Sequence, residues 1–227
     1  MLNESNSKHN FYKHIYNDYK TKIFNYQEEY YDWYRQANNL LEAINKAFKS
    51  EDKDNKVHPH QHRVGRSVLK QATEKALEIY KGNNLSEKDL NTFNKIYNFV
   101  HLVRKQIPRF GELANYDISL RIAKYLEFQY PKCGYLTEVY LHRGTLEGTE
   151  AIFNAGGMAK NIQNLDLKEG KKISVTSFPS PLNTLSGDHL ENLLCIYKHQ
   201  SKEQKMSNQK PNSCLKPKEV EKVKACV

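Results

Sequence analysis

Apolar residues recur at helical spacing through most of the first 200 residues, and this periodicity constrains the fold more than any other feature. Between Phe11 and Phe48, large apolar or aromatic side chains return every three or four positions, and similar stretches begin near positions 64, 86, 115, 145 and 186. This period places the apolar side chains on one face of each helix. Only Thr137–Leu141 and Lys171–Phe178 have the character of short strands. The sequence therefore predicts a mainly α protein: a compact single-domain helical bundle with at most one or two short strands.

The two ends of the chain differ in composition from the rest. Residues 1–10 are polar, which predicts a flexible N-terminus. Residues 201–227 are rich in Lys, Gln, Ser, Asn and Pro and have few large apolar side chains, which predicts a basic, disordered C-terminal tail. Residues 11–200 remain as the helical domain, with a possible helix break at Asn38 and Asn39.

The chain is basic, with 35 Lys and Arg against 26 Asp and Glu and a formal net charge of +9. Such a balance favours nucleic acid or another polyanion as a partner. The predicted tail alone holds seven Lys and three Glu, so +4 of the charge lies there. Arg, the residue best suited to planar recognition of phosphate, accounts for only seven of the 35 basic residues. The charge is therefore compatible with a nucleic-acid partner without requiring one.

Membrane and secretory classes are not indicated. No stretch of the sequence is apolar over ~18 residues, which is the length that a membrane-spanning helix needs. The N-terminal residues lack the apolar segment of a signal peptide, and the four cysteines have no C-x-x-C spacing. We therefore expect a cytoplasmic protein with reduced thiols and no membrane partner. The sequence leaves a protein partner or oligomeric state open.

Between two predicted helices the chain runs Ile107, Pro108, Arg109, Phe110, Gly111. Over residues 103–120 the sequence resembles the helix-hairpin-helix family of DNA-binding modules, whose turn has a hydrophobic residue, Pro, Gly, a hydrophobic residue and Gly. The resemblance implies that the turn presents backbone N–H groups to a phosphate beside the N-terminus of the next helix, where the helix dipole favours an anion. Arg109 replaces a glycine of the family pattern, so a left-handed backbone at this position would be strained.

The resemblance implies binding to the nucleic-acid backbone with little sequence specificity. The candidate nucleic-acid-binding residues are those of the turn and the basic residues on the flanking helices: Lys105, Arg109, Phe110, Gly111 and Arg121. Some members of the family are base-excision glycosylases with a Lys just after the turn, where this chain has Glu112 and Leu113. An ordinary connection between two helices is the alternative interpretation of the same residues.

Three histidines alternate in the run His58, Pro59, His60, Gln61, His62. Because Pro biases the preceding residue toward extended backbone, we expect the three imidazoles on one face, where they could hold a divalent metal ion together with a distant acid. Metal is the only cofactor that the sequence suggests. The neighbouring Arg63 and Arg66 are candidate anion-binding residues. A polar loop without a ligand is the alternative.

Two further groups of residues allow more than one interpretation. His142 and Arg143 stand beside a glycine just before a predicted helix, so they are candidate catalytic residues for acid–base chemistry on an anion. An aromatic cluster near the N-terminus could be a platform for stacking bases or, as is commoner for helical aromatics, part of the core. The cluster consists of Tyr26, Tyr30, Tyr31, Trp33 and Tyr34.

These observations leave three classes of function. The first is a nucleic-acid-associated protein that binds backbone phosphate through the turn. The second is an enzyme whose His and Arg residues act on a phosphate ester or nucleic acid, with or without a metal. The third is a non-catalytic scaffold that binds another protein through its aromatic helices.

Overall fold

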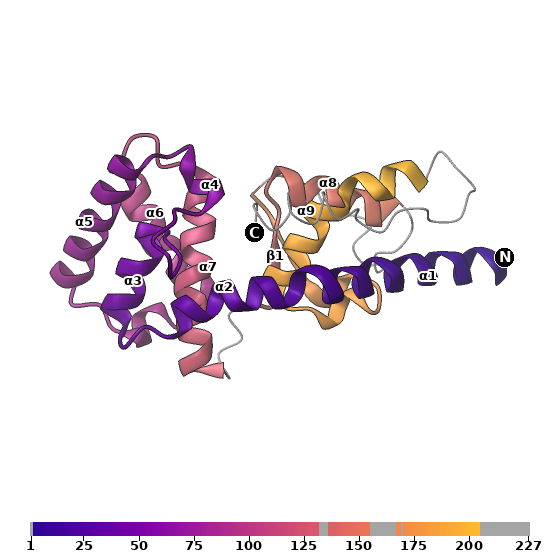
Figure 1. Ribbon diagram of the computed structural model, residues 1–227, viewed down its shortest axis with the longest axis horizontal. Coiled ribbons are helices and arrows are strands. Elements are labelled where there is room, and N and C mark those ends of the chain that lie inside the picture. The colour runs from indigo at the N-terminus through magenta and orange to yellow at the C-terminus, as the bar shows by residue number, and fades with distance from the viewer. Residues whose placement is uncertain (1, 132–135, 155–166, 169, 205–227) are drawn as a thin grey trace. The chain divides into compact units, whose positions relative to one another are not determined.

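The computed structural model describes residues 2–131, 136–154, 167–168 and 170–204, with the side chains of 2–10, 154 and 199–204 not described. The chain is mainly helical, as the periodicity predicted, and its described strands form one two-stranded sheet (Figure 1). The described helices include none that is long and apolar enough to cross a membrane. The chain divides into two compact units rather than the single body expected over residues 11–200. Below, residues 26–131 are called the central unit, and residues 2–25 with 136–204 the terminal unit.

The terminal unit is assembled from both ends of the chain. Its helices are α1 (Leu2–Tyr19), continued by the π-helical turn η1 (Lys20–Phe24), α8 (Arg143–Asn154) and α9 (Gly187–Gln204). Strand β1 (Glu138–Tyr140) pairs antiparallel with β2 (Lys172–Ser174), and Val139 lies opposite Ile173. Two 3-10 turns, η5 (Val175–Ser177) and η6 (Leu182–Thr184), lead from β2 toward α9. Helices α8 and α9 lie side by side and pack against each other (Figure 1).

The central unit is a helical bundle around one helix whose middle turns are enclosed. Helix α7 (Glu112–Gln129) buries residues on all sides, because α3 (Leu40–Lys49) and α6 (Phe93–Arg104) pack against it. Helix α5 (Arg66–Gly82) covers α3, while α2 (Asn25–Arg35), the short α4 (Pro59–His62) and the 3-10 turn η2 (Glu87–Leu90) complete the unit. A helix that is enclosed in this way has little amphipathic character, and its polar residues must find partners inside the protein.

Capping residues set the helix boundaries where the sequence suggested them. Asn39 accepts a hydrogen bond from the Glu42 backbone N–H, so the chain breaks at the predicted Asn38–Asn39 pair and α3 starts there. Ser86 forms a capping box with Asp89 at the start of η2. Gly65 is the N-cap residue of α5 and has φ 89°, a positive value that glycine adopts without strain.

Several boundaries differ from the sequence-based expectations. Helix α1 begins at Leu2, within the stretch predicted to be a flexible N-terminus, and α7 begins at Glu112 rather than at Asn115. Helix α9 continues to Gln204, into the first residues of the predicted disordered tail, and the rest of that tail lies outside the described residues. The segment around His60 is helical, so the prediction of an extended run was wrong. Pro59 occupies the first helical position, where its fixed φ favours a helix start.

A candidate metal centre on helices α4 and α7

Two charged residues of opposite sign lie one turn apart on the enclosed helix α7. The Arg121 side chain is buried, and three donors of its guanidinium are hydrogen-bonded: Nε to the Tyr30 hydroxyl at 2.8 Å, Nη1 to Ser50 Oγ at 2.8 Å and Nη2 to Gln61 Oε1 at 2.7 Å. These partners come from α2, the end of α3 and α4. A buried guanidinium is tolerated only when its donors are satisfied, so Arg121 fixes the relative positions of four helices.

The surroundings of Arg121 determine its charge and that of its neighbours. Burial alone would lower the pKa of Arg121, but Tyr30, Tyr34 and Asp117 hold this pKa above the usual value, so the guanidinium is charged. Burial also raises the pKa of Tyr30 well above its usual value, so this phenol is neutral. The Tyr30 and Tyr34 hydroxyls are 2.9 Å apart, and Tyr34 donates to the Glu51 carbonyl at 3.1 Å. This buried polar network is therefore continuous.

Asp117 lies one turn before Arg121 and is the acidic end of the same network. Its Oδ2 accepts from Gln61 Nε2 at 2.6 Å and lies 3.1 Å from His60 Nδ1. Burial by itself would raise the pKa of Asp117, but the hydrogen bond to His60 and the charges of His60, Arg121 and His58 hold it well below the usual range. The carboxylate is therefore ionised, and Gln61 joins it to Arg121.

His58, His60 and Asp117 together have the composition of a metal centre. One ring nitrogen of each histidine and one carboxylate oxygen of Asp117 all lie within 4.8 Å of one another. Ligands at the usual 2.0–2.2 Å from Zn²⁺ lie about 3.4 Å apart in a tetrahedron, so the 3.1 Å pair already has suitable spacing and a shift of about 1 Å would bring in the third atom. The His60 side chain is 37% exposed, which gives an ion access from solvent.

The outer contacts of this centre differ between its ligands. Gln61 fixes the Asp117 carboxylate by the hydrogen bond described above, as supporting groups do for metal ligands in proteins. The backbone N–H of His60 donates to His58 Nδ1 at 3.3 Å, and the His58 ring lies 5.2 Å from that of Tyr30. For Nε2 of His58 to bind an ion, the ring proton must move to Nδ1 and this hydrogen bond must break.

His62 does not belong to this cluster, so the prediction that it shares a site with His58 and His60 was wrong. Its Nε2 lies 2.6 Å from the Val57 carbonyl oxygen, to which it donates. The helical turn of α4 is the cause, because alternate residues share a face in a strand but not in a helix. The sequence had suggested only that a distant acid would complete the shell. The signal for that acid was a carboxylate and a guanidinium four residues apart in the middle of a predicted helix.

The two arginines after α4 are exposed and differ in their contacts. Arg66 donates to the Asn55 carbonyl at 3.3 Å and lies 3.9 Å from a Glu51 carboxylate oxygen. Arg63, one residue beyond α4, donates its backbone N–H to the Gln61 carbonyl, but its side chain makes no hydrogen bond or ion pair with any residue that the structure describes. Arg63 is therefore the one of the two whose charge remains available to an anion.

The turn between α6 and α7 contains one residue with a left-handed backbone. Arg109 has φ 68°, while Phe110 is buried with its ring stacked on Phe48 at 6.0 Å. Gly111 precedes α7 and provides no side-chain cap, and Arg109 and Lys105 are exposed.

Two charged side chains near this turn are already engaged. Glu112 accepts hydrogen bonds from Tyr97 and Arg104, which partly neutralises the basic character of the turn. Arg121 lies in the interior with its donors occupied, so its predicted role in contacting nucleic acid was wrong.

His142 is part of a separate polar cluster in the terminal unit. Its Nε2 is hydrogen-bonded to Glu191 and lies 2.7 Å from Thr145 Oγ1, while the Gly144 N–H donates to its Nδ1 at 3.2 Å. The Arg143 side chain is 87% exposed and lies 3.7 Å from Glu147. His142 therefore has an acidic partner that the sequence did not indicate, and it caps α8.

Comparisons with models of protein families, with curated proteins and with solved structures found no match to this chain.

Proposed function

We propose that the central unit binds a divalent transition-metal ion through His58, His60 and Asp117 and acts on a phosphate ester. The observation that carries this proposal is the convergence of two imidazole nitrogens and one ionised carboxylate oxygen within 4.8 Å. Two neutral histidines and one carboxylate leave a bound M²⁺ with a net charge of +1, which favours an anionic substrate. Three protein ligands also leave coordination positions open.

Each residue has a distinct role in this proposal. A divalent ion in such a site lowers the pKa of a bound water toward about 7 and polarises a phosphoryl oxygen. His58, His60 and Asp117 hold and orient the ion. Gln61 keeps the Asp117 carboxylate in position, and Arg63 offers an exposed cation to the non-bridging phosphate oxygens. Arg121 acts through Gln61 and does not touch the substrate.

The direct test is calorimetric titration of metal-free protein with Zn²⁺ and Mn²⁺, with His60→Ala and Asp117→Asn compared to wild type. We expect one equivalent to bind to wild type and a loss of about 100-fold or more in either variant, since a ligand contributes far more than the 10–100-fold of an outer contact. His62→Ala is the matched control, because its ring bonds to a backbone carbonyl instead. Circular dichroism checks that each variant is folded. Absence of binding to wild type, or unchanged binding to His60→Ala, would rule out the centre.

The reaction is tested separately, with a chromogenic phosphodiester in the presence of the ion that binds. We expect turnover that a chelator abolishes, and Arg63→Ala should raise KM while the metal affinity stays unchanged. If the protein binds the metal but hydrolyses no phosphate ester, the proposed metal centre stands and the proposed reaction is wrong.

We also propose a second function, binding of the nucleic-acid backbone through the turn between α6 and α7. The left-handed φ of Arg109 supports it, because the helix-hairpin-helix pattern has glycine at this position. Exposed Lys105 and Arg109 beside the uncapped start of α7 would contact phosphate.

Gel-shift titrations with DNA and RNA at low and moderate salt test this second function. We expect weak sequence preference and a strong loss of affinity with salt. Arg109→Gly keeps the backbone conformation and removes the charge, so the slope of log affinity against log salt should fall by about 0.9 on duplex DNA. Arg143→Ala, which removes an exposed arginine of the terminal unit, is the control. If the wild-type protein slows the migration of neither DNA nor RNA in the gel, the proposal is wrong.

A further inference from the structure

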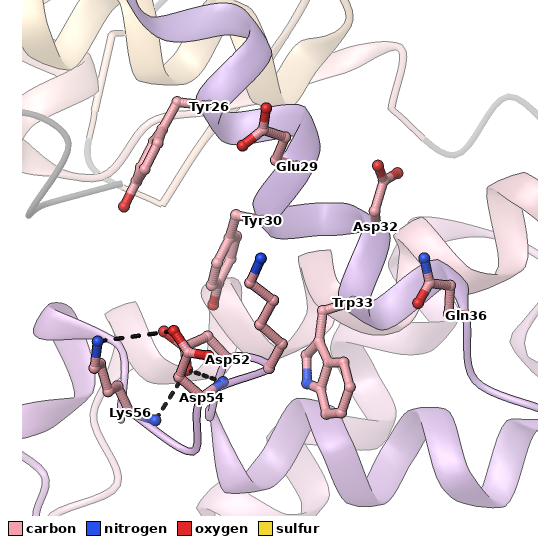
Figure 2. A pocket seen from close by; sticks show the side chains of 10 residues that line it. Tyr26, Glu29, Tyr30, Asp32, Trp33, Gln36, Asp52, Asp54 and Lys56 are labelled. Carbon is pink, nitrogen blue, oxygen red and sulfur yellow. Dashed lines mark hydrogen bonds and ion pairs between the residues drawn. The ribbon is translucent and has the colours of Figure 1, made fainter.

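A cavity of about 550 Å³ lies between helix α2 and the loop that follows α3, within the central unit (Figure 2). Its volume lies within the roughly 300–1,000 Å³ range of small-molecule sites. The candidate metal ligands do not line it, so it is a separate feature of the molecule. Its lining combines aromatic rings with an excess of acidic side chains.

The aromatic part of the lining comes from one face of α2. Tyr26, Tyr30 and Trp33 stand at positions i, i+4 and i+7 and all line the cavity (Figure 2). Tyr31 and Tyr34, from the same aromatic run, are buried in the core instead. Part of the run therefore forms core, as is common for helical aromatics, and its other rings form one wall of the cavity.

The charge of the lining argues against a nucleic-acid base on that wall. Four carboxylates and two lysines line the cavity, so its formal charge is −2 in a chain whose net charge is +9. Three of the carboxylates have partners: Asp32 pairs with Arg35 at 2.8 Å, Asp54 lies 3.7 Å from Lys56, and Asp52 accepts from the backbone N–H groups of residues 54 and 56. The Glu29 side chain is exposed, and its carboxylate has no hydrogen bond or ion pair with the described residues.

Two wall residues already face a cation within the protein: the Arg121 guanidinium carbon lies 5.8 Å from the centre of the Tyr30 ring, and Trp33 faces a lysine. Lys46 Nζ lies 4.1 Å from the centre of the Trp33 ring. Lys46 does not line the cavity, whereas Trp33 does. Tryptophan is the best of the aromatic side chains at attracting a cation, and an aromatic wall with a neighbouring carboxylate is the usual recognition of alkylammonium groups.

We propose that this cavity binds an alkylammonium group, with Tyr26, Tyr30 and Trp33 contacting its alkyl face and Glu29 as the counter-ion. Free polyamines and methylated lysine side chains share this chemistry. Lys53 also lines the cavity and itself carries an alkylammonium group. In this proposal its side chain competes with the ligand for the aromatic wall. The proposal is independent of metal binding.

Trp33 is the chain's single tryptophan, so its fluorescence reports on the cavity directly. The experiment titrates the full chain with spermidine, with tetramethylammonium and with a short peptide containing trimethyllysine. We expect a saturable change in emission that weakens as salt rises from about 20 mM to about 300 mM, since exposed charges are screened. Saturation by spermidine alone identifies a free polyamine, and saturation by the peptide identifies a protein side chain.

Four variants locate the site, with calorimetry as the second readout. Loss of one cation–π contact or one exposed charge should weaken binding about five-fold, so we expect this effect for Tyr26→Leu and for Glu29→Gln. Lys53→Met should strengthen binding. Glu74→Gln makes the same charge change as Glu29→Gln on an exposed position of α5 and should have no effect. Absence of any response to the three cations, or equal weakening by Glu29→Gln and Glu74→Gln, would overturn the proposal.

Discussion

Gln61 and Asp117 are joined by a 2.6 Å hydrogen bond in which the glutamine amide donates to the carboxylate. The other end of the same amide accepts from Arg121 at 2.7 Å. One neutral side chain on α4 therefore connects two opposite charges on α7. The Asp117 oxygen that accepts from Gln61, Oδ2, also lies 3.1 Å from His60 Nδ1. The supporting residue and the candidate ligand therefore lie in different environments: Arg121 is buried, whereas His60 is partly exposed to solvent.

Gln61→Met tests that relationship. Methionine fills a similar volume but cannot make either hydrogen bond, so Arg121 and Asp117 each lose one charge-assisted hydrogen bond. The free energy of unfolding should therefore fall by about 2–4 kcal/mol. If the centre binds metal, its affinity should also fall about 10–100-fold, because an outer contact is lost. Urea denaturation measures the first effect and calorimetry the second. Gln71→Met, at an exposed position of α5, should leave both unchanged.

Local sequence rules predicted much of the fold. The helical class followed from apolar periodicity, and the break before α3 followed from Asn39, whose capping role depends on residues only three positions away. The short strands near positions 139 and 173 were also indicated. The enclosed α7 was harder, because a helix that is buried on all sides has no polar face to mark its orientation.

The candidate metal centre could be predicted only in part. His58 and His60 were identified from their spacing, but the backbone that was assumed for them was wrong, and His62 was included because of that error. Asp117 lies 57 residues beyond His60, and only the packing of α4 against α7 brings the two together. A single sequence contains no direct signal for such a contact, whereas an acid and a base four residues apart in the buried part of a helix require polar partners there.

The crossing of α8 and α9 depends on a glycine. A Cβ on Gly148 would lie 2.3 Å from the Leu194 backbone carbonyl oxygen, which is far inside van der Waals contact. Gly148→Ala should therefore lower the free energy of unfolding by about 1–3 kcal/mol or more, because the helices must separate. Gly82→Ala is the opposite case, since a Cβ at that position in α5 would meet no atom within 4 Å and the backbone φ is not positive. It should raise stability by about 0.5–1 kcal/mol, and thermal melts of both variants check the difference in sign.

Arg109 is strained at φ 68°, a conformation that glycine adopts without steric conflict. Arg109→Gly removes a strain of about 1–2 kcal/mol, but it also gives the unfolded chain more freedom, so a net gain of about 0.5–1 kcal/mol is expected. Arg109→Lys keeps the strain and should leave stability unchanged. Denaturation midpoints distinguish the two variants, and a loss of stability in Arg109→Gly would show that the guanidinium makes stabilising contacts.

Glu42 makes the start of α3 sensitive to acid. Its carboxylate accepts from the backbone N–H of Asn38, from the Asn38 side chain and from Lys46, and these contacts lower its pKa to about 2 from the usual 4.5. A carboxyl group with a lowered pKa stabilises the folded state above its unfolded pKa, and this contribution is lost as the pH falls from about 4.5 toward 2. Solvent screening limits it to about 0.5–1 kcal/mol.

Glu42→Gln should therefore reduce stability by about this amount at pH 7 and by progressively less below pH 4.5, until the variant and wild type converge near pH 2. Urea denaturation at a series of pH values measures the difference. Glu74→Gln, at an exposed position without a partner among the described residues, should show a flat difference across the same range. A Glu42→Gln effect that persisted below the folded pKa would mean that the glutamate stabilises α3 through packing rather than through its charge.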